Sequence, residues 1–62
     1  MRLSWQEVET ACNHCGLDLI LSEDGDLILV NLEDDRDYAY PKSFEEALYM
    51  AFEFHSLAAD RR

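Results

Sequence analysis

The sequence predicts a small α+β domain of the order α-β-β-β-α, in which two helices cover a three-stranded antiparallel sheet. Three observations support this prediction: two Ser-x-x-Glu sequences that each precede a helical periodicity, two apolar runs around an Asp-Gly pair, and a short aromatic segment before Pro41. The 62 residues suit one domain near the lower size limit, which buries about 60% of the surface of its unfolded chain. We therefore expect residues 1–62 to form one acidic domain.

The first helix is expected from about residue 4 to residue 15. Ser4 and Glu7 form a capping box, in which the serine caps the glutamate N–H and the glutamate side chain reaches back. One apolar stripe of this helix should face the sheet. Its members are Trp5, Val8, Ala11, Cys12 and Cys15. Gly16 follows where a left-handed C-terminal cap is favoured.

Residues 17–32 predict a β-hairpin. Asp24-Gly25 is a preferred pair for a two-residue type I′ turn. Leu17, Leu19 and Leu21 alternate before it with Asp18, Ile20 and Ser22, and a second, mostly apolar strand follows at residues 27–32. With that turn, one buried face is formed by three cross-strand pairs, namely Leu21 with Ile28, Leu19 with Val30 and Leu17 with Leu32. A slip of one residue would exchange the two faces of a strand, so this register is a strong structural expectation.

An edge strand is expected at about residues 37–40, and a second helix at about residues 44–59. Pro41 ends the strand, and Ser43 with Glu46 repeats the capping box. The second helix has a broad apolar stripe made of Phe44, Ala47, Leu48, Ala51, Phe52, His55 and Ala58. A second, adjacent stripe consists of Met50, Phe54 and Leu57. Either this helix is wedged between the sheet and the first helix, or the second stripe is an exposed apolar contact for a homodimer or a partner.

Charge is the strongest compositional signal. Fourteen acidic residues face five basic ones, for a net charge of −9. Between Leu3 and Asp60 only Arg36 and Lys42 oppose the fourteen carboxylates, so this stretch has a net charge of −12. Direct binding to nucleic acid or to an anionic membrane requires a basic face, which the composition argues against. The charge therefore favours a basic partner, with ordinary solubility as the alternative.

The Cys12-Asn13-His14-Cys15 segment has the Cys-x-x-Cys spacing of redox and zinc sites. It lies at the C-terminal end of the expected helix, where the helix dipole disfavours a thiolate. Zinc needs four nitrogen or sulfur ligands, and His14 and His55 would complete such a set, but His14 points away from the cysteine face. We therefore expect no metal and no cofactor, and interpret both cysteines as core residues.

Other features weigh against enzymatic activity and against secretion. The acidic segments lack the spacing of a calcium-binding EF-hand loop, and a catalytic carboxylate pair needs a pocket that a domain of this size has little room to form. We expect no catalytic residue. No apolar stretch is long enough to span a bilayer and no signal peptide is evident, so we expect a cytoplasmic protein with reduced cysteines.

The predicted meander gathers carboxylates at both ends of the sheet. One end has Glu23, Asp24 and Asp26; the other has Glu33, Asp34, Asp35 and Asp37. A six-residue strand of about 20 Å would separate the two groups. Because duplex DNA carries about one negative charge per 1.7 Å of its axis, a rigid acidic protein can imitate part of that field.

In size, charge and element order, the chain resembles the small acidic inhibitors that phages encode against host restriction and CRISPR systems. Several of those inhibitors mimic DNA and occupy the basic cleft of a nuclease complex. The resemblance, which is one of class, implies a non-enzymatic anti-CRISPR or anti-restriction inhibitor whose seven carboxylates contact a basic nucleic-acid-binding protein. The alternative function is a generic adaptor or dimerisation module that uses Met50, Phe54 and Leu57.

Overall fold

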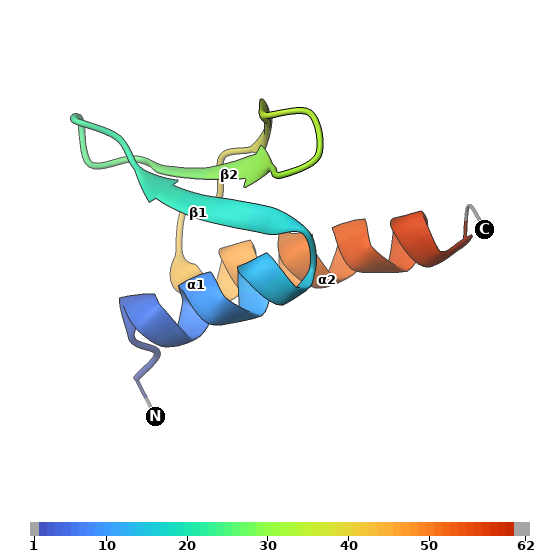
Figure 1. Cartoon of the computed structure of the whole chain (residues 1–62). Coiled ribbons are helices and arrows are strands. Elements are labelled where there is room, and N and C mark those ends of the chain that lie inside the picture. The colour runs from blue at the N-terminus through green and yellow to red at the C-terminus, as the bar shows by residue number, and fades with distance from the viewer. Residues whose placement is uncertain (1, 61–62) are drawn as a thin grey trace.

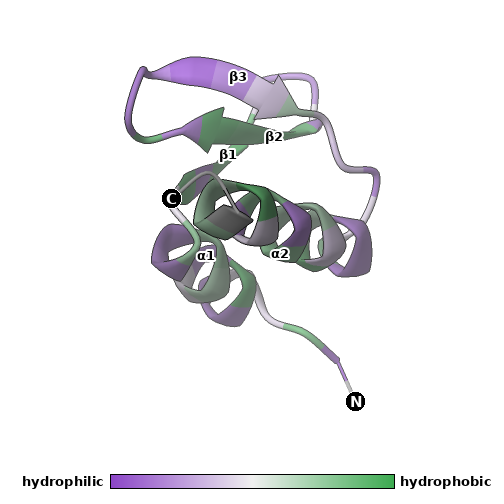
Figure 2. Ribbon diagram, turned by 90° about the vertical axis from the view of Figure 1, so that its right-hand side faces the viewer, coloured by the Kyte–Doolittle hydropathy of each residue, from purple (hydrophilic) through white to green (hydrophobic). Residues whose placement is uncertain are grey.

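The computed structural model describes residues 2–60 and confirms the predicted order α-β-β-β-α (Figure 1). The elements are α1 (Trp5–His14), β1 (Leu17–Leu21), β2 (Leu27–Asn31), β3 (Arg36–Ala39) and α2 (Phe44–Asp60). The sheet is antiparallel in the order β1-β2-β3, so β3 is an edge strand as predicted. Both helices lie side by side on one face of this sheet (Figures 1 and 2), and neither covers the opposite face.

Both serines cap their helices as predicted, but neither glutamate accepts the N–H of its capping serine, so the serine half of each capping box forms without the reciprocal bond. The Ser4 hydroxyl oxygen accepts a hydrogen bond from the Glu7 N–H at 3.2 Å and donates to the Glu7 carboxylate at 3.0 Å. At the start of α2, Ser43 accepts from the Glu46 N–H at 3.1 Å, and the Glu46 carboxylate accepts from the Lys42 N–H at 3.2 Å. These bonds satisfy backbone donors that a helix start leaves without intrahelical partners, which explains why both helices begin where expected.

The hairpin register differs by one residue from the predicted one. The observed partners are Leu17 with Asn31, Asp18 with Val30, Leu19 with Leu29, Ile20 with Ile28, and Leu21 with Leu27. The turn has three residues, since Ser22 and Asp26 still pair and the Gly25 N–H donates to the Ser22 carbonyl at 3.0 Å. Gly25 has a φ of +88°, whereas a type I′ turn would need a positive φ at Asp24 as well. The turn is therefore a type I turn followed by a glycine bulge.

The corrected register changes which residues form the core. Ile28, Val30 and Leu32, which the two-residue turn would have placed on the buried face, lie on the face of β2 away from the helices. The fully buried core consists of Val8, Cys12, Leu17, Leu19, Leu29, Ala47 and Ala51. The two alanines present little bulk, so α2 can approach the sheet and α1 closely. Gly16, at a φ of +93°, ends α1 with the expected left-handed cap.

Strand β3 is joined to α2 by an aromatic contact. Leu29 pairs with Ala39 but Val30 pairs with Asp37, so Tyr38 is an extra residue on β3. The Tyr38 ring meets the Phe54 ring edge-to-face, with 4.9 Å between ring centroids. At the other end of the helix layer, Trp5 and Phe44 make a similar edge contact at 6.2 Å.

Adjacent substitutions in β2 should distinguish the two registers. Leu29→Ala removes a fully buried side chain and should lower the free energy of unfolding by about 2–5 kcal/mol. Ile28→Ala acts on the half-buried opposite face and should cost about 1 kcal/mol or less. Urea unfolding of the two variants measures the difference. A larger loss from Ile28→Ala than from Leu29→Ala would support the register of the two-residue turn instead.

Candidate functional site

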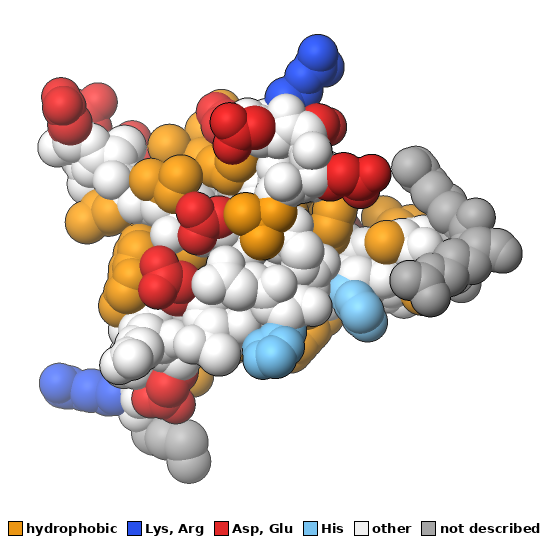
Figure 3. All heavy atoms as spheres, viewed as in Figure 1, with side chains coloured by type: hydrophobic (Ala, Val, Ile, Leu, Met, Phe, Trp, Pro, Cys, Tyr) orange, Lys and Arg blue, Asp and Glu red, His pale blue; other side chains and the backbone are white. Residues whose placement is uncertain are grey.

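The structure places the predicted carboxylates in two exposed groups at opposite ends of the sheet (Figures 1 and 3). The hairpin cluster comprises Glu23, Asp24 and Asp26, at the β1–β2 turn. The distal cluster comprises Glu33, Asp34, Asp35 and Asp37, at the β2–β3 turn and the start of β3. Strand β2 has five residues, so about 17 Å of extended chain lies between the two turns.

The hairpin cluster is held by Ser22 and by the backbone. The Ser22 N–H donates to the Asp26 carbonyl at 2.8 Å, and the Ser22 hydroxyl oxygen accepts from the Asp26 N–H at 3.0 Å. These bonds do not involve the carboxylates of the cluster. Its charge can therefore be changed while the bonds that hold the turn are kept.

Several members of the distal cluster also support the turn that carries them. The Asp34 carboxylate accepts from the Arg36 N–H at 3.1 Å, and Asp35 has a φ of +61° while its N–H donates to the Asn31 carbonyl at 2.8 Å. Asn31 also accepts from the Glu33 N–H at 2.9 Å through its side chain. Aspartate and asparagine tolerate this left-handed conformation better than most residues, so Asp34 and Asp35 have a structural role in addition to their charge.

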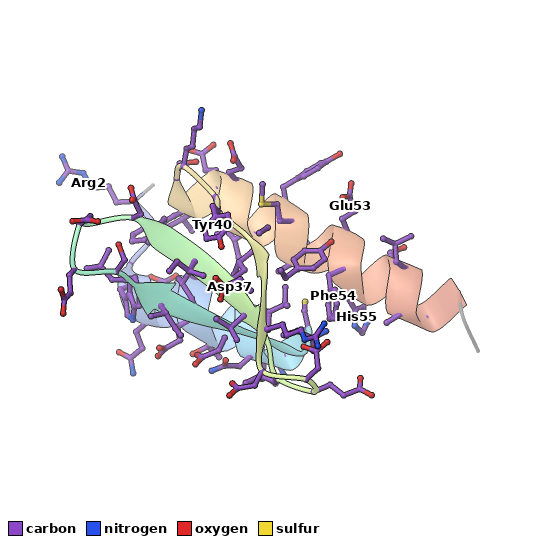
Figure 4. The ribbon with its side chains drawn as sticks, turned by 90° about the horizontal axis from the view of Figure 1, so that it is seen from above. Arg2, Asp37, Tyr40, Glu53, Phe54 and His55 are labelled. Atoms are coloured by element: carbon purple, nitrogen blue, oxygen red, sulfur yellow. The ribbon has the colours of Figure 1, made fainter. Side chains whose placement is uncertain are left out.

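Asp37 differs from the rest because its carboxylate binds a tyrosine. The Tyr40 hydroxyl donates to Asp37 at 2.7 Å, and this hydrogen bond, together with the negative charge of Asp37, raises the pKa of Tyr40 above its usual value. Figure 4 shows both residues on the part of the chain that forms and follows β3. The sequence analysis did not identify this pair, although its spacing of three residues was visible.

Between the two clusters lies an apolar surface that the sequence analysis missed. We call it the outer sheet face: Ile20, Ile28, Val30, Leu32 and Tyr40, with Asp18 and Asp37 beside them. Ile20 is 41% exposed, Leu32 53% and Tyr40 61%, whereas Val30 is buried by its neighbours but does not belong to the core cluster. In Figure 3 hydrophobic side chains cover the hairpin region between carboxylates at its ends. The predicted register would have turned most of this surface inward.

The second stripe of α2 is only partly exposed. Met50 and Phe54 are half-buried and pack against the core, and Figure 4 shows Phe54 on the sheet side of the helix. Leu57 is 52% exposed. Phe52, expected in the core stripe, is 59% exposed, because the buried side of α2 centres on Ala47 and Ala51. Met50 and Phe54 therefore match the first of the two alternatives, in which this helix is wedged between the sheet and α1.

The cysteines occupy the core side of α1, as their spacing predicts. Cys12 is fully buried and Cys15 is half-buried, and both are free thiols. Burial raises the pKa of Cys12 to about 11, with further contributions from Cys15 and Asp18, and burial also raises the pKa of Cys15. Protonated thiols are poor nucleophiles and poor metal ligands. Among the described side chains, those of residues 2–59, no three His, Cys, Asp or Glu residues gather as a metal site would require.

The buried thiol should make stability depend on alkaline pH. Its pKa is 9.0 ordinarily and about 11 in the folded chain, so between these values the unfolded state loses the proton that the folded state keeps. The free energy of unfolding should therefore fall from about pH 9 to about pH 11. Urea unfolding at pH 8 and pH 10.5 should show this loss in wild type and a smaller loss in Cys12→Ala.

At pH 7 the same Cys12→Ala variant should be about 1 kcal/mol less stable than wild type, because it removes a buried sulfur. A chelator should leave the melting temperature of wild type unchanged. Stoichiometric zinc in the purified protein would contradict this structural role of the cysteines.

A shallow hollow of about 520 Å³ lies between the β1–β2 turn and the segment that follows β3. It is lined by Gly25, Asp26, Leu27, Tyr40, Pro41 and Lys42. The hollow is partly open to solvent, and its lining includes one cationic side chain, Lys42, one anionic side chain, Asp26, and the phenol of Tyr40.

No family model, curated protein or solved structure matches this chain in the comparisons made. Among the helices that the structure describes, none combines the length and apolar character needed to cross a membrane. The candidate site therefore rests on its own geometry, which consists of two acidic clusters on either side of an apolar sheet face.

Proposed function

We propose that this chain is a non-enzymatic inhibitor, acting in the cytoplasm, that imitates nucleic acid and occupies the basic surface of a DNA-binding protein or complex. An anti-CRISPR or anti-restriction role belongs to this class. The observation that carries the proposal is the placement of two exposed carboxylate clusters at fixed turns on opposite ends of one short sheet. A basic cleft is the partner whose charge complements this arrangement.

The charge density of the chain supports this proposal. The chain has a net charge of −9 and is 35 Å long, which gives one net negative charge per about 4 Å of length. One strand of duplex DNA carries one charge per about 3.4 Å. In this protein the charges are fixed to backbone turns, so a partner would meet them in one arrangement without first ordering a flexible chain.

A second candidate function is an adaptor or dimerisation module that uses the apolar side chains of α2. Leu57 remains available for this role, and Tyr49 and Phe52, which are 69% and 59% exposed, add an aromatic pair three residues apart. Such a pair lies on one side of a helix. Glu45 and Glu53 lie on the same solvent side of α2, so a second copy would meet like charge there.

The proposal is tested by removing charge without disturbing the turns. The triple variant Glu23→Gln, Asp24→Asn, Glu33→Gln changes side chains outside the hydrogen bonds that hold the two turns, and it should fold at least as well as wild type because self-repulsion is reduced. It should compete with duplex DNA for a basic partner about tenfold less well at low salt, with a smaller difference at high salt.

The partner is obtained by affinity purification from the native host, and competition is then titrated at two salt concentrations. A matched control removes three charges from the helices, as Glu9→Gln, Glu45→Gln, Glu53→Gln, and should compete nearly as well as wild type. Purification of non-basic partners only, or a folded cluster variant that competes like wild type, would refute the mimicry and favour the adaptor function.

A further inference from the structure

We infer that the outer sheet face docks a cationic amphipathic helix of the partner protein. The inference rests on the proposed function, because it names the part of a basic partner that this chain would contact. It differs from that function in one respect: the centre of the contact is apolar, and the carboxylates surround it.

The apolar centre follows from the register of the hairpin. Ile20 on β1 pairs with Ile28 on β2, so the two side chains stand together on the face that neither helix covers. Leu32 extends this surface along β2, since its N–H donates to the Gly16 carbonyl at 3.1 Å and so continues the ladder. Tyr40, after β3, contributes a ring that is 61% exposed.

The charges around this centre specify the chemistry of its occupant. The hairpin cluster lies beyond one end of β2, and the distal cluster lies beyond the other end except for Asp37, which pairs with Val30. On β1, Asp18 stands beside Ile20. An apolar surface with carboxylates at both ends complements an apolar stripe with lysine or arginine at both ends. A helix rises about 1.5 Å per residue, so about 12 residues would span the 17 Å between the turns.

The same charges disfavour the other occupants. Two copies that packed these faces together would each bring a net charge of −9, and either relative orientation would place an acidic cluster on an acidic cluster. Nucleic acid and anionic lipid surfaces would be repelled in the same way. A cationic protein segment is therefore the occupant that the charge arrangement favours.

The test uses the full chain and a peptide of about 12 residues with leucines along one side of a helix and lysines elsewhere. A peptide of the same composition in scrambled order is the charge control. Isothermal titration calorimetry should show that wild type binds the amphipathic peptide at least tenfold more tightly than the scrambled one. Amide chemical-shift changes should centre on β1 and β2.

Two serine variants locate the contact. Ile20→Ser should weaken binding of the amphipathic peptide about tenfold, while Phe52→Ser, which removes a comparably exposed apolar residue from α2, should change it less than twofold. Leu32→Ser, at the end of the hairpin ladder just after β2, serves as the second variant if Ile20→Ser loosens the sheet. Circular dichroism and melting curves establish that each variant is folded.

The inference is overturned if folded Ile20→Ser and Leu32→Ser both bind like wild type, if Phe52→Ser weakens binding as much, or if the scrambled peptide binds equally well. A dimer in sedimentation that Ile20→Ser dissociates would also overturn it, because the face would then belong to a second copy. If the acidic variants stop competing with DNA but Ile20→Ser keeps full peptide binding, the proposed function stands and this inference fails. If Ile20→Ser weakens peptide binding while the acidic variants still compete with DNA like wild type, the inference is supported and the proposed function is not.

Discussion

The three-residue turn between β1 and β2 determines which side of β2 meets the helices, and the rest of the structure depends on it. With Gly25 at a φ of +88°, Leu29 stands opposite Leu19 and enters the core. A two-residue turn would rotate Ile28 and Val30 toward the helices, because a shift of one residue exchanges the faces of a strand. One glycine conformation therefore sets the composition of both the core and the outer sheet face.

The elements with local causes could be predicted from the sequence, whereas the choices that depend on distant residues could not. Helix α1 begins and ends within a residue of its predicted limits because Ser4, Glu7 and Gly16 act on their own backbone neighbourhood. Asp24-Gly25 fits both a two-residue and a three-residue turn. The predicted register is wrong because the choice between these turns depends on the packing of Leu29 in the core. Phe52 was misplaced for a similar reason: the side of α2 that is buried depends on where α1 and β3 lie.

The carboxylates of the hairpin cluster and of the distal cluster contribute unequally to the turns that carry them. In the hairpin cluster the turn is held by Ser22 and by backbone atoms, and the hydrogen bonds that hold it do not involve the carboxylates of the cluster. In the distal cluster Asp34 accepts a backbone N–H, Asp35 adopts a left-handed conformation and Asp37 accepts the Tyr40 hydroxyl. Charge reversal at these three positions would change charge and turn geometry together, whereas asparagine keeps an acceptor oxygen and tolerates the same backbone.

In the proposed contact between the outer sheet face and a basic partner, charge and apolar surface have different roles because they act over different distances. The carboxylates act over about 8 Å at physiological salt, which would accelerate encounter with the proposed basic partner but would leave the complex sensitive to ionic strength. The side chains of Ile20, Ile28 and Tyr40 act only on contact, and their burial is much less affected by moderate salt. A mimic that used charge alone would compete for any basic protein of the cell. An apolar centre would restrict such a mimic to partners that also present a matching apolar stripe. A basic surface without that stripe would desolvate the carboxylates while leaving the apolar centre without a contact.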